Sequence, residues 1–368
     1  MLAWHVNEDG SRALRALPEI DPAPGGVSIR MLAAPVLSYM GQVLDGKLGY
    51  ALPPRPFVPG TNGVGVIEKV GAGVHHLHAG DKVLLDPRAI VDERVAEPAQ
   101  ILIGLTAMGG AGSSAQDSLH DQAVLDLQQQ WRDGTFTEMA HMPASVLTPV
   151  PRELADMPGE RLVALSKFAV PYGGLAKAGL AAGETLIVNG ATGYFGSAAA
   201  LLALAMGAAR VVAAGRDPAA LAALAAAAGP RLVTVALAGD AVADAQALRQ
   251  AAGGGADLAI DLVGRADSAA ATAAALHGLR RGGRLVLMGS VKEPLPLLVG
   301  EMLANDWQVM GCFMYPKAAL ARLAALAAAG LLDLGRVNVR TYPLKDLEAA
   351  LAAAAGMRGL DLTALTMA

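Results

Sequence analysis

The sequence predicts an α/β protein of two domains. Its 368 residues are about twice the length of a typical single domain, so each half can bury its own core. The first 155 residues contain short strand-like runs, whereas apolar runs alternate with alanine-rich helical segments from about residue 160. A chain that is 54% hydrophobic and only 17% charged is globular and not disordered.

The N-terminal part predicts a β structure with long loops. Strands are predicted at 27–33, 63–70 and 82–85, because these runs favour strands and clusters rich in Gly, Pro and Asp separate them. This spacing is typical of a small barrel or sandwich. The stretch 98–135, which includes Gly109 to Ser114, predicts an irregular excursion or a short helix.

The following segments predict a parallel sheet with helices on both faces, because β-α-β units repeat. Apolar runs such as 186–188 are typical of strands buried on both faces. Beyond residue 315 a helix is predicted at 316–329, a strand at 337–339 and a last helix at 344–354. The predicted strands of the sheet are 185–189, 210–214, 231–236, 256–261 and 284–288, and the helices are 197–206, 218–228, 244–251 and 268–279.

A dinucleotide-binding loop is the strongest motif. The strand 185–189 runs into a glycine-rich turn and then directly into a helix. Gly193 allows a pyrophosphate to approach the backbone, Gly196 allows close packing of helix and strand, and the helix N-terminus presents free N–H groups. The alternative is an ordinary βα turn. The predicted loop residues are Ala191, Thr192, Gly193, Tyr194, Phe195 and Gly196.

The end of the next strand predicts a preference for NADPH. An NAD site usually has a carboxylate there for the ribose 2′-hydroxyl, but this chain has Gly215 and Arg216. A guanidinium can hold a 2′-phosphate through charge-assisted hydrogen bonds. The alternative is that Arg216 is a solvated loop residue and Asp217 caps the next helix.

Cys312 is the single cysteine of the chain. It excludes an intramolecular disulfide and a Cys-rich zinc centre, and it fits a reducing compartment. The N-terminus lacks the apolar core of a signal peptide and no apolar run is long enough to cross a bilayer, so we expect a cytoplasmic protein without membrane association. A net charge of −4 provides no basic surface for nucleic acid, so a small-molecule partner is expected.

Several motifs resemble those of the medium-chain dehydrogenase/reductase superfamily over essentially the whole chain. They include 59–67, 70–74, 80–83, 133–138 and the loop 189–193. The resemblance implies a GroES-like catalytic domain at 1–155, a Rossmann domain at 156–316 and a return of 317–368 to the first domain. It further implies a homodimer formed through the edge of the Rossmann sheet, near Val309 to Met314.

The chain departs from the zinc-dependent members of this family at the metal ligands. The positions of the catalytic Cys and His ligands look like Leu37 and Thr61, and the third ligand, near Val170 and Pro171, is missing. The resemblance therefore implies no zinc and no Lewis acid that polarises a carbonyl. His75, His76 and His78 are predicted to lie on a solvated turn, with Leu77 pointing inward.

The loop motifs look most like the zinc-independent quinone oxidoreductase and enoyl reductase branch. The resemblance then implies hydride transfer from NADPH to an activated alkene or a quinone, with a donor for the developing enolate. Tyr39 is the first candidate proton donor and Tyr172 the second, with Gln42 and Asn62 as polar wall; Tyr39 could equally be a core aromatic. The nicotinamide end is expected near Met288, Gly289, Ser290 and Phe313, and Val263 completes the predicted cofactor-binding set.

Two other functions stay open at this point. One is a zinc-independent alcohol dehydrogenase or carbonyl reductase that uses Tyr39 or Tyr172 as the acid. The other is a non-catalytic NADPH-binding protein. Cys312 is expected to be a buried apolar thiol in a strand beside Phe313, with no catalytic role.

Overall fold

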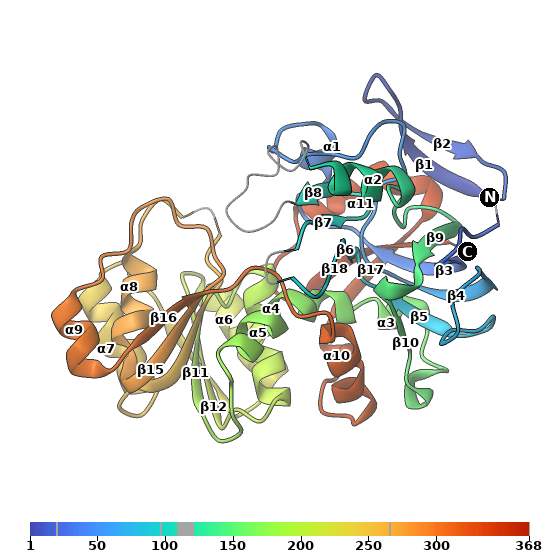
Figure 1. Cartoon of the computed structure of the whole chain (residues 1–368). Helices are drawn as coiled ribbons and strands as arrows, with labels where there is room; N and C mark the ends of the chain where they lie inside the picture. Colours follow the sequence, from blue (N-terminus) through green and yellow to red (C-terminus); the bar gives the residue numbers. More distant parts are fainter. Residues whose placement is uncertain (20, 96–97, 109–120, 265, 368) are drawn as a thin grey trace. The chain divides into compact units, whose positions relative to one another are not determined.

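A computed structural model of the chain describes residues 1–19, 21–95, 98–108, 121–264 and 266–367 (Figure 1). It divides into two compact units. Unit 1 comprises Met1–Ser166, Asn338–Met357 and Leu362–Ala368, and unit 2 comprises Lys167–Val337 and Arg358–Asp361. These breaks lie further along the chain than the predicted ones, after 155 and 316, so the predicted helix 316–329 falls within unit 2.

The core of unit 1 is a mostly antiparallel seven-stranded sheet. The strand order is β10-β5-β4-β3-β18-β17, and β9 also pairs with β3. Inward side chains such as Ile29, Ile67 and Val83 are fully or almost fully buried in one apolar cluster. The strands are β3 (Gly26–Pro35), β4 (Gly63–Val70), β5 (Lys82–Leu85), β9 (Met139–Pro143), β10 (Leu147–Pro149), β17 (Asn338–Pro343) and β18 (Asp361–Thr366). The three strands predicted for this part are confirmed.

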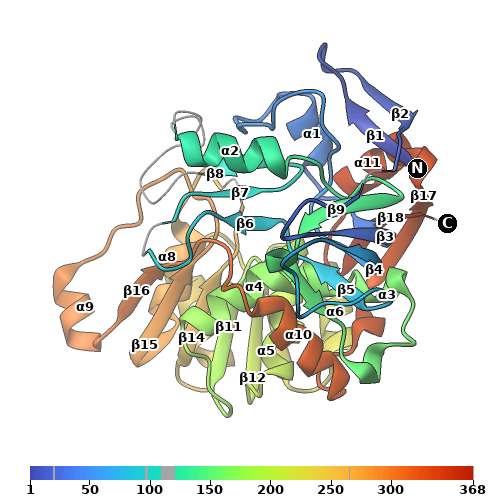
Figure 2. The ribbon, with the colours of Figure 1, turned by 45° about the vertical axis from the view of Figure 1, so that its right-hand side comes forward.

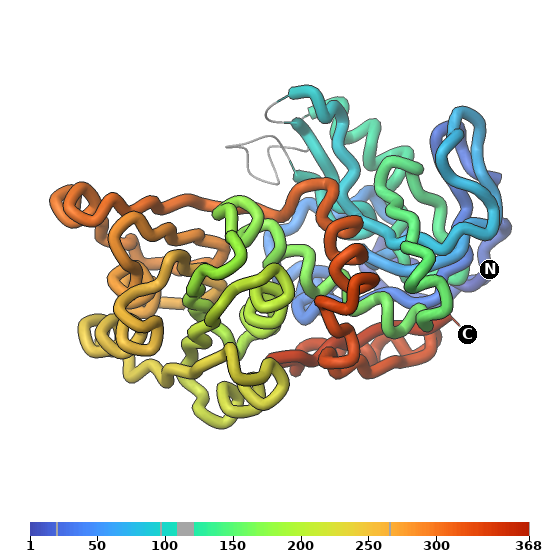
Figure 3. Tube along the Cα trace, turned by 90° about the horizontal axis from the view of Figure 1, so that it is seen from below, coloured from blue at the N-terminus to red at the C-terminus, as the bar shows by residue number. Residues whose placement is uncertain are grey.

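Smaller elements complete unit 1. The stretch 98–135 contains two short strands and helix α2, which begins after its N-cap Asp121 and lies over β7 and β8 (Figure 2); the predicted Gly109 to Ser114 segment lies outside the described residues. The first and last described segments of the chain both belong to this unit (Figure 3). The elements are β1 (Leu2–Val6), β2 (Arg12–Ala16), β6 (Arg88–Ile90), β7 (Gln100–Leu102), β8 (Thr106–Met108), α1 (Met40–Leu44), α2 (Gln122–Gln130), α3 (Gly159–Leu162) and α11 (Leu347–Ala355).

Unit 2 is built on a six-stranded parallel sheet in the order β13-β12-β11-β14-β15-β16. The order reverses between β11 and β14, and ligands of such open sheets bind beyond the carboxyl ends of the strands at this point. Leu186, Ile187 and Val188 are fully buried, as expected for a strand covered on both faces. The strands are β11 (Thr185–Asn189), β12 (Arg210–Gly215), β13 (Leu232–Ala236), β14 (Ala256–Asp261), β15 (Leu279–Leu287) and β16 (Gln308–Gly311).

The helices of unit 2 follow the predicted alternation. Two of them begin at aspartates that act as N-caps: Asp217 accepts hydrogen bonds from the N–H groups of Ala219 and Ala220, and Asp240 does the same for α7. The predicted α/β fold class and parallel sheet are confirmed. The helices are α4 (Leu165–Lys177, entered from unit 1), α5 (Tyr194–Ala205), α6 (Pro218–Ala228), α7 (Ala241–Ala251), α8 (Ala270–His277), α9 (Val299–Asn305) and α10 (Ala319–Ala328).

Two features of the edge of this sheet differ from the sequence-based expectation. Helix α9 was not predicted, because its apolar residues Val299 and Leu303 are exposed and no buried stripe marks it. Cys312 is not a buried strand residue: β16 ends at Gly311, and the thiol is half-buried. None of the helices within the described residues is long and apolar enough to span a membrane.

Candidate functional site

The glycine-rich loop joins β11 to α5 at the carboxyl edge of the unit 2 sheet. A Cβ atom at Gly196 would lie 2.1 Å from the carbonyl oxygen of Gly190, so only glycine allows the helix to pack this closely on the loop. A Cβ atom at Gly193 would meet only the Gly190 oxygen, at 3.2 Å, so the loop is nearly open on that side. Among the described residues, no side chain caps the N-terminus of α5. Uncapped N–H groups at a helix N-terminus form an anion-binding site.

The ends of the neighbouring strands lie against this loop. A Cβ atom at Gly215 would lie 2.9 Å from Cγ2 of Thr192, which places the end of β12 beside the loop. A Cβ atom at Gly190 would lie 3.2 Å from the backbone nitrogen of Val263, beyond β14. Beyond β15, the N–H of Ser290 donates to the carbonyl of Val263 at 3.0 Å. The structure therefore brings together the loop residues, Gly215, Val263 and Ser290 at one edge.

Arg216 and Asp217 follow β12 at this edge. The carboxylate of Asp217 accepts hydrogen bonds from Ala219 and Ala220 at 3.0 and 3.1 Å, so it is engaged as a helix cap. Arg216 is exposed and makes no hydrogen bond or ion pair with the described residues. A guanidinium without an internal partner therefore stands where a dinucleotide would place its adenosine ribose.

Helix α4, which carries Tyr172, packs closely against Met288 in unit 2. Tyr172 is half-buried on α4, and the two glycines that follow it allow close packing of the helix: a Cβ atom at Gly174 would lie 2.4 Å from Sδ of Met288. Gly289 packs in the same way on Val263, where a Cβ atom would lie 2.3 Å from the carbonyl oxygen. Phe313 is 76% exposed beyond β16.

The other three catalytic candidates lie in unit 1. Tyr39 is half-buried as the N-cap residue of α1, and its ring centroid lies 6.0 Å from that of Tyr50. Gln42 lies three residues later, within α1, and is exposed. Asn62 donates from Nδ2 to the carbonyl of Leu85 at 3.2 Å.

Two buried polar residues flank the point where the strand order reverses. Asn189 on β11 and Asp261 on β14 are register partners, and both are buried. Asp261 accepts hydrogen bonds from the Thr272 hydroxyl and, at 2.9 Å, from the Val263 N–H. Burial raises the pKa of the Asp261 carboxyl, although these hydrogen bonds act in the opposite direction.

The segment Arg358–Asp361 is hydrogen-bonded to the glycine-rich loop and the start of α5. The Gly359 N–H donates to the Thr192 carbonyl at 3.2 Å, and the Ser197 hydroxyl donates to the Gly359 carbonyl at 2.6 Å. This contact explains why Arg358–Asp361 belongs to unit 2 although the flanking residues belong to unit 1. Sequence reasoning missed it, because no local pattern pairs residues about 160 positions apart.

The described residues do not present a metal site. They contain no group of three or more His, Cys, Asp or Glu side chains that could hold an ion. Leu37 and Thr61 carry no imidazole, thiolate or carboxylate, so these positions do not fit zinc coordination. His75, His76 and His78 are exposed and Leu77 is buried, as predicted.

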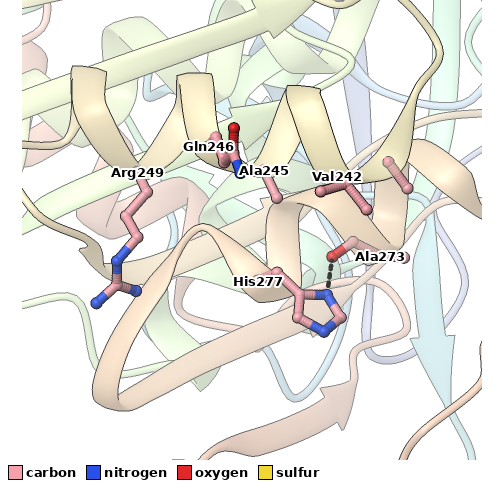
Figure 4. A pocket seen from close by; sticks show the side chains of 7 residues that line it. Val242, Ala245, Gln246, Arg249, Ala273 and His277 are labelled. Carbon is pink, nitrogen blue, oxygen red and sulfur yellow. Dashed lines mark hydrogen bonds between the residues drawn. The ribbon is translucent and has the colours of Figure 1, made fainter.

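A hollow of about 280 Å³ lies between α7 and α8 (Figure 4). His277 lines it, and its Nδ1 lies 2.9 Å from the Ala273 carbonyl oxygen. The hollow contains none of the predicted site residues.

Comparison with known proteins gives matches over both units. Residues 23–152 match the alcohol dehydrogenase GroES-like domain, and residues 195–329 match the zinc-binding dehydrogenase family. The chain is 31% identical over 360 residues to a Mycobacterium tuberculosis protein named "Putative alcohol dehydrogenase D". The match covers 90% of this chain and 90% of that protein.

Solved structures resemble the whole chain. The 2R,3R-butanediol dehydrogenase from Bacillus subtilis has a TM-score of 0.77 at 18% identity and covers 100% of this chain and 99% of its own. A "putative zinc-binding dehydrogenase" from Sinorhizobium meliloti 1021, bound to NADP, has a TM-score of 0.71 at 20% identity and covers 99% and 98%. These matches confirm the predicted combination of a GroES-like domain and a Rossmann-type sheet.

Proposed function

Because the chain belongs to the medium-chain dehydrogenase/reductase superfamily of oxidoreductases, we propose that it transfers a hydride between NADPH and a small organic molecule. The observation that carries this proposal is the carboxyl edge of the unit 2 sheet. There a helix N-terminus and a glycine cradle adjoin Arg216, and the described residues provide neither a cap for the helix nor a partner for the arginine. The NADP-bound state of the Sinorhizobium meliloti structure supports the choice of cofactor.

Each part of this edge would hold one part of the dinucleotide. The N–H groups at the start of α5 would bind the pyrophosphate, which Gly193 allows to approach. Arg216 would bind the 2′-phosphate, and Val263, Gly289 and Ser290 would border the nicotinamide half. Bound NADPH supplies the hydride, and the chain's own residues orient it and exclude water.

We propose that the reaction proceeds without zinc, although the family description that matches residues 195–329 refers to zinc binding. The support is the donor set, since Leu37 and Thr61 offer no ligand of the usual kind. Without a Lewis acid, the acceptor must be activated in another way: by conjugation to a carbonyl group within the same molecule, or by a hydrogen-bond donor of the protein. An activated alkene or a quinone fits this requirement best.

The second candidate is the interconversion of an alcohol and a carbonyl compound. Its support is that the relatives reported above are named alcohol and butanediol dehydrogenases. Tyr39 or Tyr172 would then protonate the oxygen in place of a metal.

An NADPH-oxidation screen tests the proposal. We expect turnover with a quinone or an enone, and a kcat/KM for the enone at least tenfold above that for its saturated ketone analogue. Elemental analysis of the same sample should find less than 0.1 zinc per chain. Preference for the ketone would favour the second candidate, and tight NADPH binding without any turnover would favour a non-catalytic protein.

Replacing Tyr39 by phenylalanine should lower kcat at least tenfold and leave KM for NADPH unchanged. The phenol is the first candidate donor to the developing enolate, and general acid catalysis usually contributes tenfold or more. Tyr50→Phe is the matched control, since its ring is the neighbour of Tyr39. A Tyr39→Phe enzyme with full kcat would remove this residue from the mechanism.

We propose that two copies associate through β16, an edge strand of the sheet. Leu298, Val299, Leu303 and Phe313 near this edge are each at least 60% exposed, and such an apolar group marks an interaction surface. Leu303→Asp should convert a dimer to a monomer in sedimentation equilibrium. Leu331→Asp, at a 60% exposed leucine after α10, should leave the mass unchanged. A wild-type monomer would contradict the proposal.

A further inference from the structure

Lys167 is a fully buried lysine beneath the glycine-rich loop. It lies in the first turns of α4, and its Nζ is 3.3 Å from the centroid of the Tyr194 ring. The same nitrogen donates to the carbonyl of Asp361 at 3.2 Å. Lys167 therefore contacts both the first residue of α5 and the segment that is fastened to the loop.

The surroundings of Nζ disfavour an ammonium ion in the unliganded protein. Burial lowers the pKa of Lys167 to about 6, and only the carboxylate of Asp361 acts in the opposite direction. Tyr194, the other titratable group that faces it, is neutral because burial raises the pKa of its phenol. The N-terminus of α5 carries the positive end of the helix dipole, which also disfavours a protonated Lys167.

The geometry nevertheless suits a cation. A nitrogen 3.3 Å from an aromatic centroid is well within the range of cation–π contacts, which require the protonated form. A nearby negative charge would be needed to stabilise the protonated form of Lys167. The proposed function places phosphates, which carry such charge, at the N-terminus of α5.

We propose that Lys167 is a positioning residue for the dinucleotide, a buried charge partner that takes up a proton when phosphates bind at the N-terminus of α5. The proton passes from solvent to Nζ, and no covalent bond changes. The resulting ammonium holds Tyr194 by a cation–π contact and the 358–361 segment by its hydrogen bond to Asp361. This inference rests on the proposed binding of a dinucleotide at the loop.

The expected linkage is large enough to measure. A nearby negative charge at an effective dielectric of about 20 raises the pKa of an ammonium by about one to two units. Starting from a pKa of about 6, binding at pH 7 should add about half a proton to Lys167. The affinity of the wild type should fall about tenfold as the pH rises from 6 to 8.

Isothermal titration of NAD+ and NADP+ at pH 7 in buffers of different ionisation enthalpy measures the proton uptake. NAD+ has no 2′-phosphate, so titration of that group does not contribute. We expect the wild type to take up about half a proton more than Lys167→Met, with Kd of the variant raised several-fold. Lys177→Met removes an exposed lysine of the same helix and should behave as the wild type.

Equal proton uptake by the wild type and Lys167→Met would overturn the inference and leave the proposed function intact. Failure of the wild type to bind either nucleotide would instead contradict the proposed function. If Lys167→Met does not fold, the pH dependence of Kd for NAD+ in the unmodified protein decides. A Kd that does not change between pH 6 and 8 would then overturn the inference.

Discussion

Replacing Arg216 by alanine should lower kcat/KM for NADPH about 100-fold and leave kcat/KM for NADH within about threefold. Charge-assisted hydrogen bonds to a phosphate are the strong ones, and the loss of about 3 kcal/mol corresponds to a factor of about 100. The wild type should prefer NADPH. The ratio of the two kcat/KM values, measured with one acceptor, checks the expectation.

The surroundings of Arg216 are the reason for expecting this residue to decide the preference. The carboxylate of the next residue, Asp217, accepts hydrogen bonds from two backbone N–H groups of α6, so it is already engaged as a helix cap. The Arg216 guanidinium has no partner among the described residues, so binding a phosphate would break no existing hydrogen bond or ion pair of its side chain. We therefore expect charge-assisted binding of the 2′-phosphate rather than recognition of a 2′-hydroxyl.

A matched control separates this effect from general charge. Arg322 is exposed on α10 of the same unit, and Arg322→Ala should leave both kcat/KM values unchanged. A wild type that prefers NADH, or an Arg216→Ala variant that loses activity equally with both cofactors, would contradict the assignment.

The elements of unit 2 were largely predictable because their sequence signals are local. Strands β11 and β14 and helix α6 have the predicted bounds, since each apolar run ends at a glycine, an aspartate or a proline. Helix α9 and the half-buried state of Cys312 were not predicted. Both lie at the sheet edge: α9 has no buried apolar stripe, and Cys312 follows an apolar run that looks like a longer strand but ends at Gly311.

The site was predictable only where one segment carries it. The glycine-rich loop and the arginine after β12 are short patterns with a known physical role. Lys167 gives no such signal, because a lysine in an apolar helical run usually extends its amine to solvent. Only the tertiary contacts with Tyr194 and Asp361 show that its amine is enclosed.

The enclosure of Lys167 has a second consequence, for stability. Its pKa of about 6 in the folded chain lies far below that of an unfolded lysine, about 10.4, so the unfolded chain binds one more proton throughout this interval. Stability therefore rises with pH, by up to about 1.4 kcal/mol per pH unit between about pH 6.5 and 10. Below pH 6 both states are protonated and this contribution no longer changes.

Lys167→Met should remove this slope and raise the free energy of unfolding at pH 7 by about 2 kcal/mol. Keeping the buried amine neutral at pH 7 costs about 4 to 5 kcal/mol. The methionine avoids that cost. It also leaves the Asp361 carbonyl without this hydrogen-bond donor, which lowers the free energy of unfolding by about 1 to 3 kcal/mol.

Urea unfolding of the free protein from pH 6 to 9.5 measures both quantities. The difference between wild type and variant isolates Lys167, because the other titratable groups contribute to both chains. Lys177→Met should keep the wild-type slope, since its amine is exposed in the folded chain. Parallel stability profiles for wild type and Lys167→Met would mean that the folded chain keeps Lys167 charged at neutral pH. The buried amine would then have no proton left to take up when phosphates bind, so this measurement also decides whether the linkage proposed for the loop can exist.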